Sequence, residues 1–154
     1  MKVNAVILNY NDADTVETLV HSICGYESLE HIILVDNHSQ DDSRQRLQQL
    51  ARENEKIQLV FLEENGGYGK GNNAGVRFAV RENQADYVLI SNPDVVFSEK
   101  CLKKMLHVFE SHPDVAAVTA RMEDARYGTQ KNAWPLRGFW GELLSMGPVS
   151  RRLF

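Results

Sequence analysis

Residues 86–97 read Asp86-Tyr87-Val88-Leu89-Ile90-Ser91-Asn92-Pro93-Asp94-Val95-Val96-Phe97. The continuous apolar run from Tyr87 to Ile90 is typical of a strand buried on both faces, as in a parallel sheet covered by helices. Pro93 cannot donate a backbone hydrogen bond and restricts Asn92 to extended geometry, so the strand should end there. Asp94 is therefore predicted just past the carboxyl end of a central strand, the edge at which open α/β sheets bind their ligands.

Two interpretations of Asp94 follow from this position. A carboxylate at that edge can bind a hard divalent cation, and the cation can in turn bind phosphate oxygens. Alternatively, Asn92-Pro93-Asp94 is an ordinary turn between a strand and a helix, and Asp94 serves only that turn. The rest of the chain favours the first interpretation.

Length and composition are those of an ordinary globular protein. With 154 residues, the chain can form one domain that buries roughly 68–70% of its unfolded surface. The net charge of −4 argues against a general nucleic-acid surface. No apolar run approaches the ~20 residues of a spanning helix, and Met1-Lys2-Val3 leads into an expected strand rather than a signal peptide. We therefore expect a cytoplasmic protein whose cysteines, Cys24 and Cys101, are reduced core residues.

Strand and helix patterns alternate along the chain. Short apolar runs predict strands at residues 3–8, 32–35, 57–62, 87–90 and 115–120. Apolar residues at helical spacing predict helices between them. The first helix should close at Gly25, the second should open at a Ser39–Asp42 capping box, the third should bury Val76, Ala79 and Val80, and the fourth should run from Ser98 to just before Pro113. This alternation predicts an α/β fold: a Rossmann-like, mostly parallel sheet with right-handed crossovers and helices on both faces.

Three of the predicted strands end in polar corners. These are Asn9-Tyr10-Asn11, Asp36-Asn37 and Asn92-Pro93-Asp94. Because the carboxyl ends of parallel strands lie at one edge of the sheet, we expect the three corners to converge. An aspartate such as Asp36 can accept a hydrogen bond there from a ribose hydroxyl or a base N–H.

A glycine-rich run, residues 66–75, follows the third predicted strand and opens a helix. Glycines let the backbone approach a ligand, the helix start offers N–H groups to phosphate, and Lys70 adds a cation. Gly69, Gly71 and Ala74 formally fit the dinucleotide fingerprint, but this follows the third strand rather than the first. A flexible turn with a tight helix start is the alternative. Tyr68 within the run either stacks on a nucleobase or is an exposed loop residue.

Four motifs together resemble family-two nucleotide-sugar glycosyltransferases, and most nearly the rhamnosyltransferase-like branch that builds bacterial surface polysaccharides. The resemblance covers about residues 3 to 120. The motifs are Val6-Ile7-Leu8-Asn9-Tyr10-Asn11, Val35-Asp36-Asn37-His38-Ser39, the run Asn65-Gly66-Gly67-Tyr68-Gly69-Lys70-Gly71-Asn72-Asn73-Ala74-Gly75, and Asn92-Pro93-Asp94-Val95.

The resemblance implies a GT-A fold, a nucleotide-diphosphate-sugar donor, a glycan or lipid-linked acceptor, a divalent metal (Mn²⁺ or Mg²⁺) and inversion at the anomeric carbon. It implies that Asn9, Tyr10 and Asn11 line the nucleoside pocket, with Asp36 on the base or ribose. The Gly66–Asn73 loop, with Gly67, Lys70, Gly71 and Asn72, would approach the base and diphosphate. Asn92 and Asp94 occupy the positions of the family's Asp-x-Asp motif, and Asp94 would bind the metal.

Two features depart from the family pattern. Asn92 replaces the first aspartate of the metal motif, so one charged protein ligand remains and the donor's phosphates must complete the site. Family members are also generally longer than 154 residues. We therefore expect a truncated enzyme whose catalytic base lies beyond Phe154, although Glu123, Asp124 and Glu142 are carboxylates within the chain.

The domain prediction is a donor-binding α/β domain over residues 1–121 and an irregular segment, 122–154, leading into a missing acceptor half. Residues 134–154 combine apolar, aromatic and arginine side chains, which suits a homo-oligomer contact or a membrane surface, and hence a peripheral location at the inner face of the membrane. Alternative functions are a non-catalytic nucleotide-sugar binding module, then a nucleotidyltransferase, then a flavodoxin-like receiver or structural domain.

Overall fold

The computed structural model describes residues 1–121, 123–124 and 128–129. Met1–Val115 form one compact unit that contains four parallel strands and four helices in strict alternation. In chain order these are β1 (Val3–Asn9), α1 (Ala13–Ile23), β2 (His31–Asp36), α2 (Ser43–Glu53), β3 (Ile57–Phe61), α3 (Gly67–Arg81), β4 (Tyr87–Ser91) and α4 (Glu99–Ser111). A separate unit begins at Ala116 and holds the short antiparallel pair β5 (Glu123–Asp124) and β6 (Gly128–Thr129).

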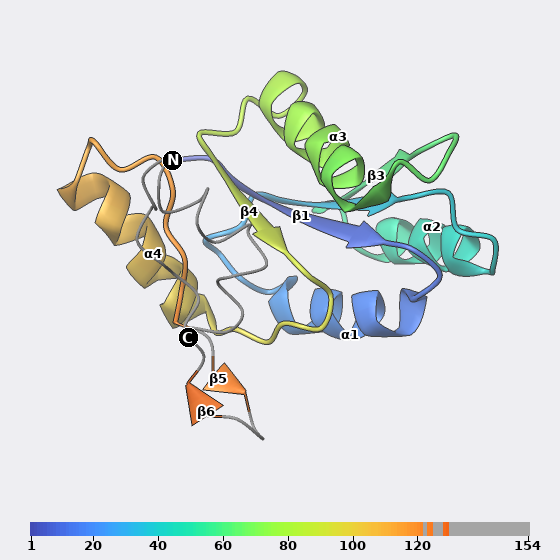
Figure 1. The fold of residues 1–154 in the computed structure, drawn as a ribbon, viewed down its shortest axis with the longest axis horizontal. Coiled ribbons are helices and arrows are strands. Elements are labelled where there is room, and N and C mark those ends of the chain that lie inside the picture. Colours follow the sequence, from blue (N-terminus) through green and yellow to red (C-terminus); the bar gives the residue numbers. More distant parts are fainter. Residues whose placement is uncertain (122, 125–127, 130–154) are drawn as a thin grey trace, which may run out of the picture. The chain divides into compact units, whose positions relative to one another are not determined.

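The four strands form one parallel sheet in the order β3-β2-β1-β4. The chain moves outward from β1 to β2 and β3, and then returns to place β4 on the other side of β1 (Figure 1). The strand order therefore reverses between β1 and β4. In open α/β sheets this switch point, at the carboxyl ends of the strands, is where ligands bind.

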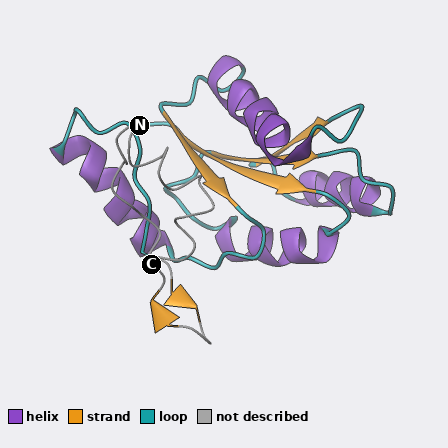
Figure 2. Cartoon of the chain, viewed as in Figure 1, coloured by secondary structure: helices purple, strands orange, loops and turns teal. Residues whose placement is uncertain are grey.

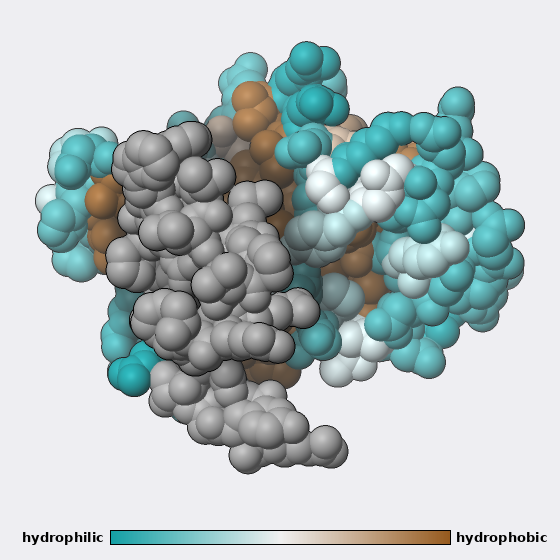
Figure 3. Space-filling model, in the orientation of Figure 1, coloured by the Kyte–Doolittle hydropathy of each residue, from teal (hydrophilic) through white to brown (hydrophobic). Residues whose placement is uncertain are grey.

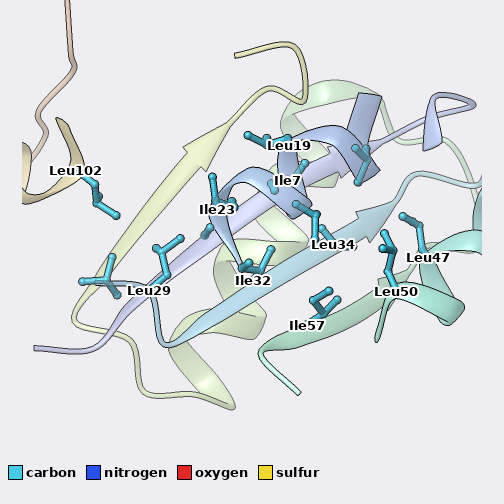
Figure 4. Close-up of a cluster of buried hydrophobic side chains, with 14 residues drawn as sticks. Ile7, Leu19, Ile23, Leu29, Ile32, Leu34, Leu47, Leu50, Ile57 and Leu102 are labelled. Carbon is cyan, nitrogen blue, oxygen red and sulfur yellow. The ribbon is translucent and has the colours of Figure 1, made fainter. Parts of the chain in front are cut away.

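Helices cover both faces of the sheet, as predicted (Figure 2). On one face, β1 and β2 residues pack with α1, α2 and Leu102 of α4 in the larger core cluster (Figure 4). On the other face, α3 contributes Ala79 to a smaller cluster with Val6, Ile33 and Val35. Neighbouring residues of β1 thus pack into the core clusters on opposite faces of the sheet, which explains why its sequence is continuously apolar.

The glycine run is part of a helix rather than a loop, because α3 begins at Gly67. A Cβ at Gly71 would overlap the Leu8 side chain, and a Cβ at Gly75 would overlap Val6 and lie 2.8 Å from Cγ2 of Val35. Residues four apart share one helix face. These two glycines therefore let α3 lie directly on β1 and β2.

Three predictions about the elements are wrong. Val80 is 52% exposed, because the sheet-facing side of α3 carries Gly71, Gly75 and Ala79 instead. Ser39 does not open α2, which begins at Ser43, since the Ser39 hydroxyl accepts hydrogen bonds from Asn9 and Asn11. Residues 115–120 form no strand; the Val115 N–H bonds the His112 carbonyl in a turn, and three alanines in the segment add little strand propensity.

The predicted start and end of α4 are confirmed. Ser98 caps α4 by accepting a hydrogen bond from the Cys101 N–H at 3.2 Å, and α4 ends at Ser111, before Pro113. Cys24 and Cys101 are free, as predicted, but they are partly buried rather than core residues. Within the described ranges, no helix has the length and apolar character needed to cross a membrane. On the face seen in Figure 3, most described surface is hydrophilic and hydrophobic residues are exposed in smaller areas between.

The loop between β4 and α4 is anchored on the α1–β2 connection. The Tyr26 hydroxyl donates to the Phe97 carbonyl at 2.7 Å, and the two rings meet edge to face at 6.0 Å. Two residues later, Glu99 accepts hydrogen bonds from the backbone N–H and the hydroxyl of Ser28, at 3.0 and 2.9 Å. These bonds lower the pKa of the Glu99 carboxyl. The far end of the Asp94 loop is therefore held in place.

Candidate functional site

The corners of β1 and β2 are joined by a buried hydrogen-bond network. Asn9 and Asp36 are register partners at the ends of the two strands. The Asn9 amide donates to Asp36 Oδ1 at 3.0 Å and to Ser39 Oγ at 3.1 Å. Asp36 Oδ2 accepts from the Ser39 N–H at 3.2 Å and lies 3.9 Å from Arg44 Nε. Asp36 is fully buried, so in this structure it holds the corner together, and its contact with a nucleoside stays a prediction.

The loop after β1 is fixed by the same network and leaves one side chain outward. Asn11 has a left-handed backbone (φ 54°), which asparagine tolerates better than most residues. Its N–H donates to Ser39 Oγ at 3.0 Å, and its amide oxygen accepts from the Gln40 N–H at 2.7 Å. Tyr10 between them is 47% exposed. Of the three predicted nucleoside-pocket residues, Asn9 and Asn11 shape the loop and Tyr10 presents a ring to solvent.

A second set of amide hydrogen bonds ties the β2 corner to the start of α3. Asn37 donates to Asn65 Oδ1 at 2.8 Å and accepts from the Gly66 N–H at 3.1 Å. Asn65 Oδ1 also accepts from the Gly67 N–H at 2.9 Å. Gly67 has a φ of +76°, a conformation that favours glycine. Asn37 and Asn65 belong to the quoted motifs, but their joint role as a clamp was not predicted.

The predicted α3 residues divide into two groups. Lys70 lies on the surface and forms an ion pair with Glu64, which lowers the pKa of the Glu64 carboxyl. Asn72 is buried and donates to the Tyr68 carbonyl at 3.0 Å. Gly71 packs on Leu8. Packing alone therefore explains Gly71 and Asn72, whereas Gly67 and Lys70 lie where a ligand could reach them.

A hollow of about 360 Å³ opens between the corners of β1 and β4, at the switch point of the sheet. Its lining comes from both corners, the start of α1 and the start of α3: Leu8, Asp12, Thr15, Tyr68, Asn92, Pro93 and Asp94. Asp12 accepts from the Thr15 hydroxyl at 2.7 Å. The Tyr68 hydroxyl reaches across to Asn92 Oδ1 at 2.9 Å.

The β4 corner is a turn, as both interpretations of Asp94 require. The Val95 N–H bonds the Asn92 carbonyl at 3.2 Å, with Pro93 at the position where its fixed φ suits a turn. Asn92 and Asp94 are both exposed. Turn chemistry therefore explains Pro93, while the exposed Asp94 carboxylate at the hollow remains available to a ligand.

Asp12 and Thr15 were not predicted as site residues. The signal was present, because Asp12 follows the first polar corner directly and Thr15 lies one helical turn further on. The sequence does not show that α1 begins beside the β4 corner. That neighbourhood follows from the strand order.

The side chains at the hollow offer oxygen ligands, namely the carboxylates of Asp94 and Asp12 and the amide oxygen of Asn92. Such hard donors suit Mg²⁺ or Mn²⁺. In the part of the chain that the structure describes, no group of three or more His, Cys, Asp or Glu side chains is arranged to hold a metal. The residues therefore fit a cation that a ligand's phosphates help to hold.

Residues 5–146 match the model of the family described as "Glycosyl transferase family 2". The chain belongs to this family. The resemblance in its motifs is thereby confirmed at family level.

Among curated relatives, the chain is 34% identical over 106 residues to the putative teichuronic acid biosynthesis glycosyltransferase TuaG of Bacillus subtilis, covering 68% of this chain and 40% of that protein. It is 26% identical over 106 residues to the low-salt glycan biosynthesis hexosyltransferase Agl10 of Haloferax volcanii, covering 69% of this chain and 32% of that protein. The chain thus spans about a third to two fifths of these relatives.

Two solved structures share the fold. The mannosyltransferase PcManGT of Pyrobaculum calidifontis, in complex with GDP-Man and Mn²⁺, matches with a TM-score of 0.62 at 19% identity, covering 70% of this chain and 32% of that one. TarS 1–349 of S. aureus in complex with UDP-GlcNAc matches with a TM-score of 0.59 at 21% identity, covering 80% and 38%. The predicted GT-A fold, present as a partial domain, is confirmed.

Proposed function

We propose that this chain is the donor-binding part of an inverting glycosyltransferase that takes a sugar from a nucleotide diphosphate and passes it to an acceptor hydroxyl in surface polysaccharide synthesis. One observation carries the proposal: the exposed Asp94 carboxylate lines a hollow at the switch point of the sheet. Family membership and the glycan-building relatives support it.

The site residues divide the binding task by position. The exposed ring of Tyr10 is the side chain best placed to meet a nucleobase. Lys70 would meet phosphate, since its partner Glu64 is at the surface and the ion pair can open. Asp94, with the Asn92 oxygen, would hold Mn²⁺ or Mg²⁺ against the diphosphate. Such a cation, when bound, would neutralise charge on the leaving group.

Inverting transfer has one further requirement. The acceptor oxygen forms a bond to the anomeric carbon while the bond from that carbon to the diphosphate oxygen breaks, and the hydroxyl proton passes to a base. We propose that this base, and the acceptor wall, lie outside this chain. A general base is worth roughly 10²–10⁴-fold in rate, and losing the acceptor wall also removes positioning. We therefore expect donor binding without useful turnover.

The test compares binding with transfer. Calorimetry with UDP-, dTDP- and GDP-sugars, with and without Mn²⁺, should show metal-assisted binding of one nucleotide class. A rhamnosyltransferase-like role predicts that a rhamnose donor binds best. A transfer assay on this chain beside a C-terminally extended one should give turnover only for the extended chain. Turnover by both would place the base within these 154 residues, and binding of no nucleotide sugar would refute the proposal.

A non-catalytic nucleotide-sugar binding module is the second candidate, because the chain spans only 32–40% of these relatives. It predicts binding in both chains and turnover in neither. For the whole protein we propose a cytoplasmic location, peripheral at the membrane, with a glycan or lipid-linked acceptor. The surface assigned to a membrane or a second copy, residues 134–154, lies outside the described residues.

A further inference from the structure

One hydrogen bond spans the hollow and joins two elements that a donor would have to pass between. The Tyr68 hydroxyl, on the first turn of α3, donates to Asn92 Oδ1, at the corner of β4, at 2.9 Å. Tyr68 is 60% exposed and Asn92 is also exposed. Asp94 lines the same hollow two residues later. The bond therefore occupies an oxygen beside the carboxylate that we assign to the cation.

The turn that carries Tyr68 does not have its glycines packed against the sheet. A Cβ at Gly67 or Gly69 would meet no atom within 4 Å, whereas Gly71 and Gly75 are packed against the sheet. Glycine at position 69 is therefore not required by packing, and it lowers helix stability by about 1 kcal/mol relative to alanine. The backbone of this turn is held by the Asn37 and Asn65 amides, while the exposed Tyr68 side chain has room to move.

Asn92 can serve either of two partners. Its amide oxygen is an acceptor with two lone pairs, and amide oxygens are ordinary ligands for hard cations. While Tyr68 donates to it, the oxygen is turned toward α3. A cation held by Asp94 and a diphosphate would compete for the same oxygen.

We propose that Tyr68 lowers the affinity for the cation and donor by competing for the Asn92 amide oxygen. Its hydroxyl holds the Asn92 amide before the donor arrives, and the bond is exchanged when a cation and a nucleoside diphosphate bind. The inference rests on the proposed function, because it assumes that this site takes a nucleotide with a cation. It also gives Asn92, where the family motif has aspartate, a role of its own.

The test is calorimetry of UDP binding with Mn²⁺, with GDP and dTDP measured in parallel. Tyr68→Phe keeps the ring and removes only the competing donor, so it should tighten binding by roughly 2- to 13-fold, the range expected for one neutral hydrogen bond. In an Asn92→Ala background, adding Tyr68→Phe should change nothing. Tyr87→Phe, which removes a hydroxyl at the opposite end of β4, should match wild type.

The outcomes separate the two proposals. Tightening by Tyr68→Phe that disappears with Asn92→Ala supports the exchange. Unchanged or weaker binding by Tyr68→Phe overturns it, as does equal tightening in both backgrounds, because Tyr68 would then act elsewhere. If wild type binds nucleotide and Tyr68→Phe does not increase the affinity, only the inference about Tyr68 fails. If wild type binds none of the three diphosphates with Mn²⁺, the proposed function fails with it.

Discussion

The two halves of the carboxyl edge are built in opposite ways. At the β1–β2 corner, Asp36 is fully buried and its carboxylate has partners on Asn9 and Ser39. At the β4 corner, Asn92 and Asp94 are exposed, and the Asn92 side chain accepts a hydrogen bond from Tyr68. The comparison teaches that a residue in a family motif can be a framework residue or a ligand residue. Burial separates the two where the motif does not.

The largest expected effect concerns the framework half. Asp36→Ala should lower the free energy of unfolding by about 3 kcal/mol, because it leaves one N–H of the buried Asn9 amide and the partly buried Ser39 N–H without their acceptor. Urea unfolding measures this. Asp94→Ala is the matched control at the other corner and should stay within about 0.5 kcal/mol of wild type. Equal losses in the two variants would break the comparison.

The glycines of α3 repeat the contrast within one helix. Gly75→Val should cost about 2 kcal/mol, since even its Cβ overlaps Val6 and the sheet cannot retreat. Gly69→Ala meets open space and should stabilise by up to about 1 kcal/mol through helix propensity. Both are read from urea unfolding. A destabilising Gly69→Ala would contradict the view that the Tyr68 turn is unpacked.

At the β4 corner, a substitution should change ligand affinity rather than stability. Asp94→Ala should abolish the gain in UDP affinity that Mn²⁺ provides, an expected loss of about tenfold, or about 1.4 kcal/mol. Calorimetry with and without Mn²⁺ measures it. In the absence of metal, the variant and wild type should bind UDP alike. If the Mn²⁺ gain survives in Asp94→Ala, another ligand holds the cation.

The smallest expected effect is a pH dependence of stability at an exposed ion pair near the start of α3, outside both corners. Lys70 lowers the pKa of the Glu64 carboxyl from its usual 4.5. A depressed pKa in the folded state adds stability above the unfolded value, and this is lost as the pH falls through the folded value. The stability difference between wild type and Glu64→Gln should therefore shrink as the pH is lowered below 4.5. Urea unfolding at neutral and acid pH tests this; a constant difference would show that the ion pair adds nothing.

Much of the fold could be predicted because each strand is an apolar run with a polar end. Pro93 and the corners at Asn9 and Asp36 marked the strand ends, and parallel strands bring such ends together. Residues 115–120 were wrongly predicted as a strand because an apolar run shows only that a segment is able to form a strand, and three of these six residues are alanines with low strand propensity. The membrane, oligomer and domain predictions for 122–154 fall largely outside the described residues and stay predictions.

The site could be predicted only in part, because the same residue type occurs at different positions for different structural reasons. Glycine occurs in the run for close packing at Gly71 and Gly75 and for a positive φ at Gly67, and sequence does not separate these. Ser39 has the spacing of a helix cap, but the Asn9 and Asn11 donors use its hydroxyl. Asp12 and Thr15 line the hollow because β4 pairs with β1. A local sequence pattern does not give the strand order.

The anchoring of Phe97 by Tyr26 has a consequence for the entropy of binding. The β4–α4 loop leaves the sheet after Ser91, the last residue of β4, and is held at Phe97 by Tyr26. Only the residues from Asn92 to Val96 lie between these two points. Ordering a free residue costs roughly 1–2 kcal/mol, so a long unanchored loop would lose much of its binding energy in becoming ordered. This short tethered segment restricts that loss to a few residues, and Asp94 is one of them.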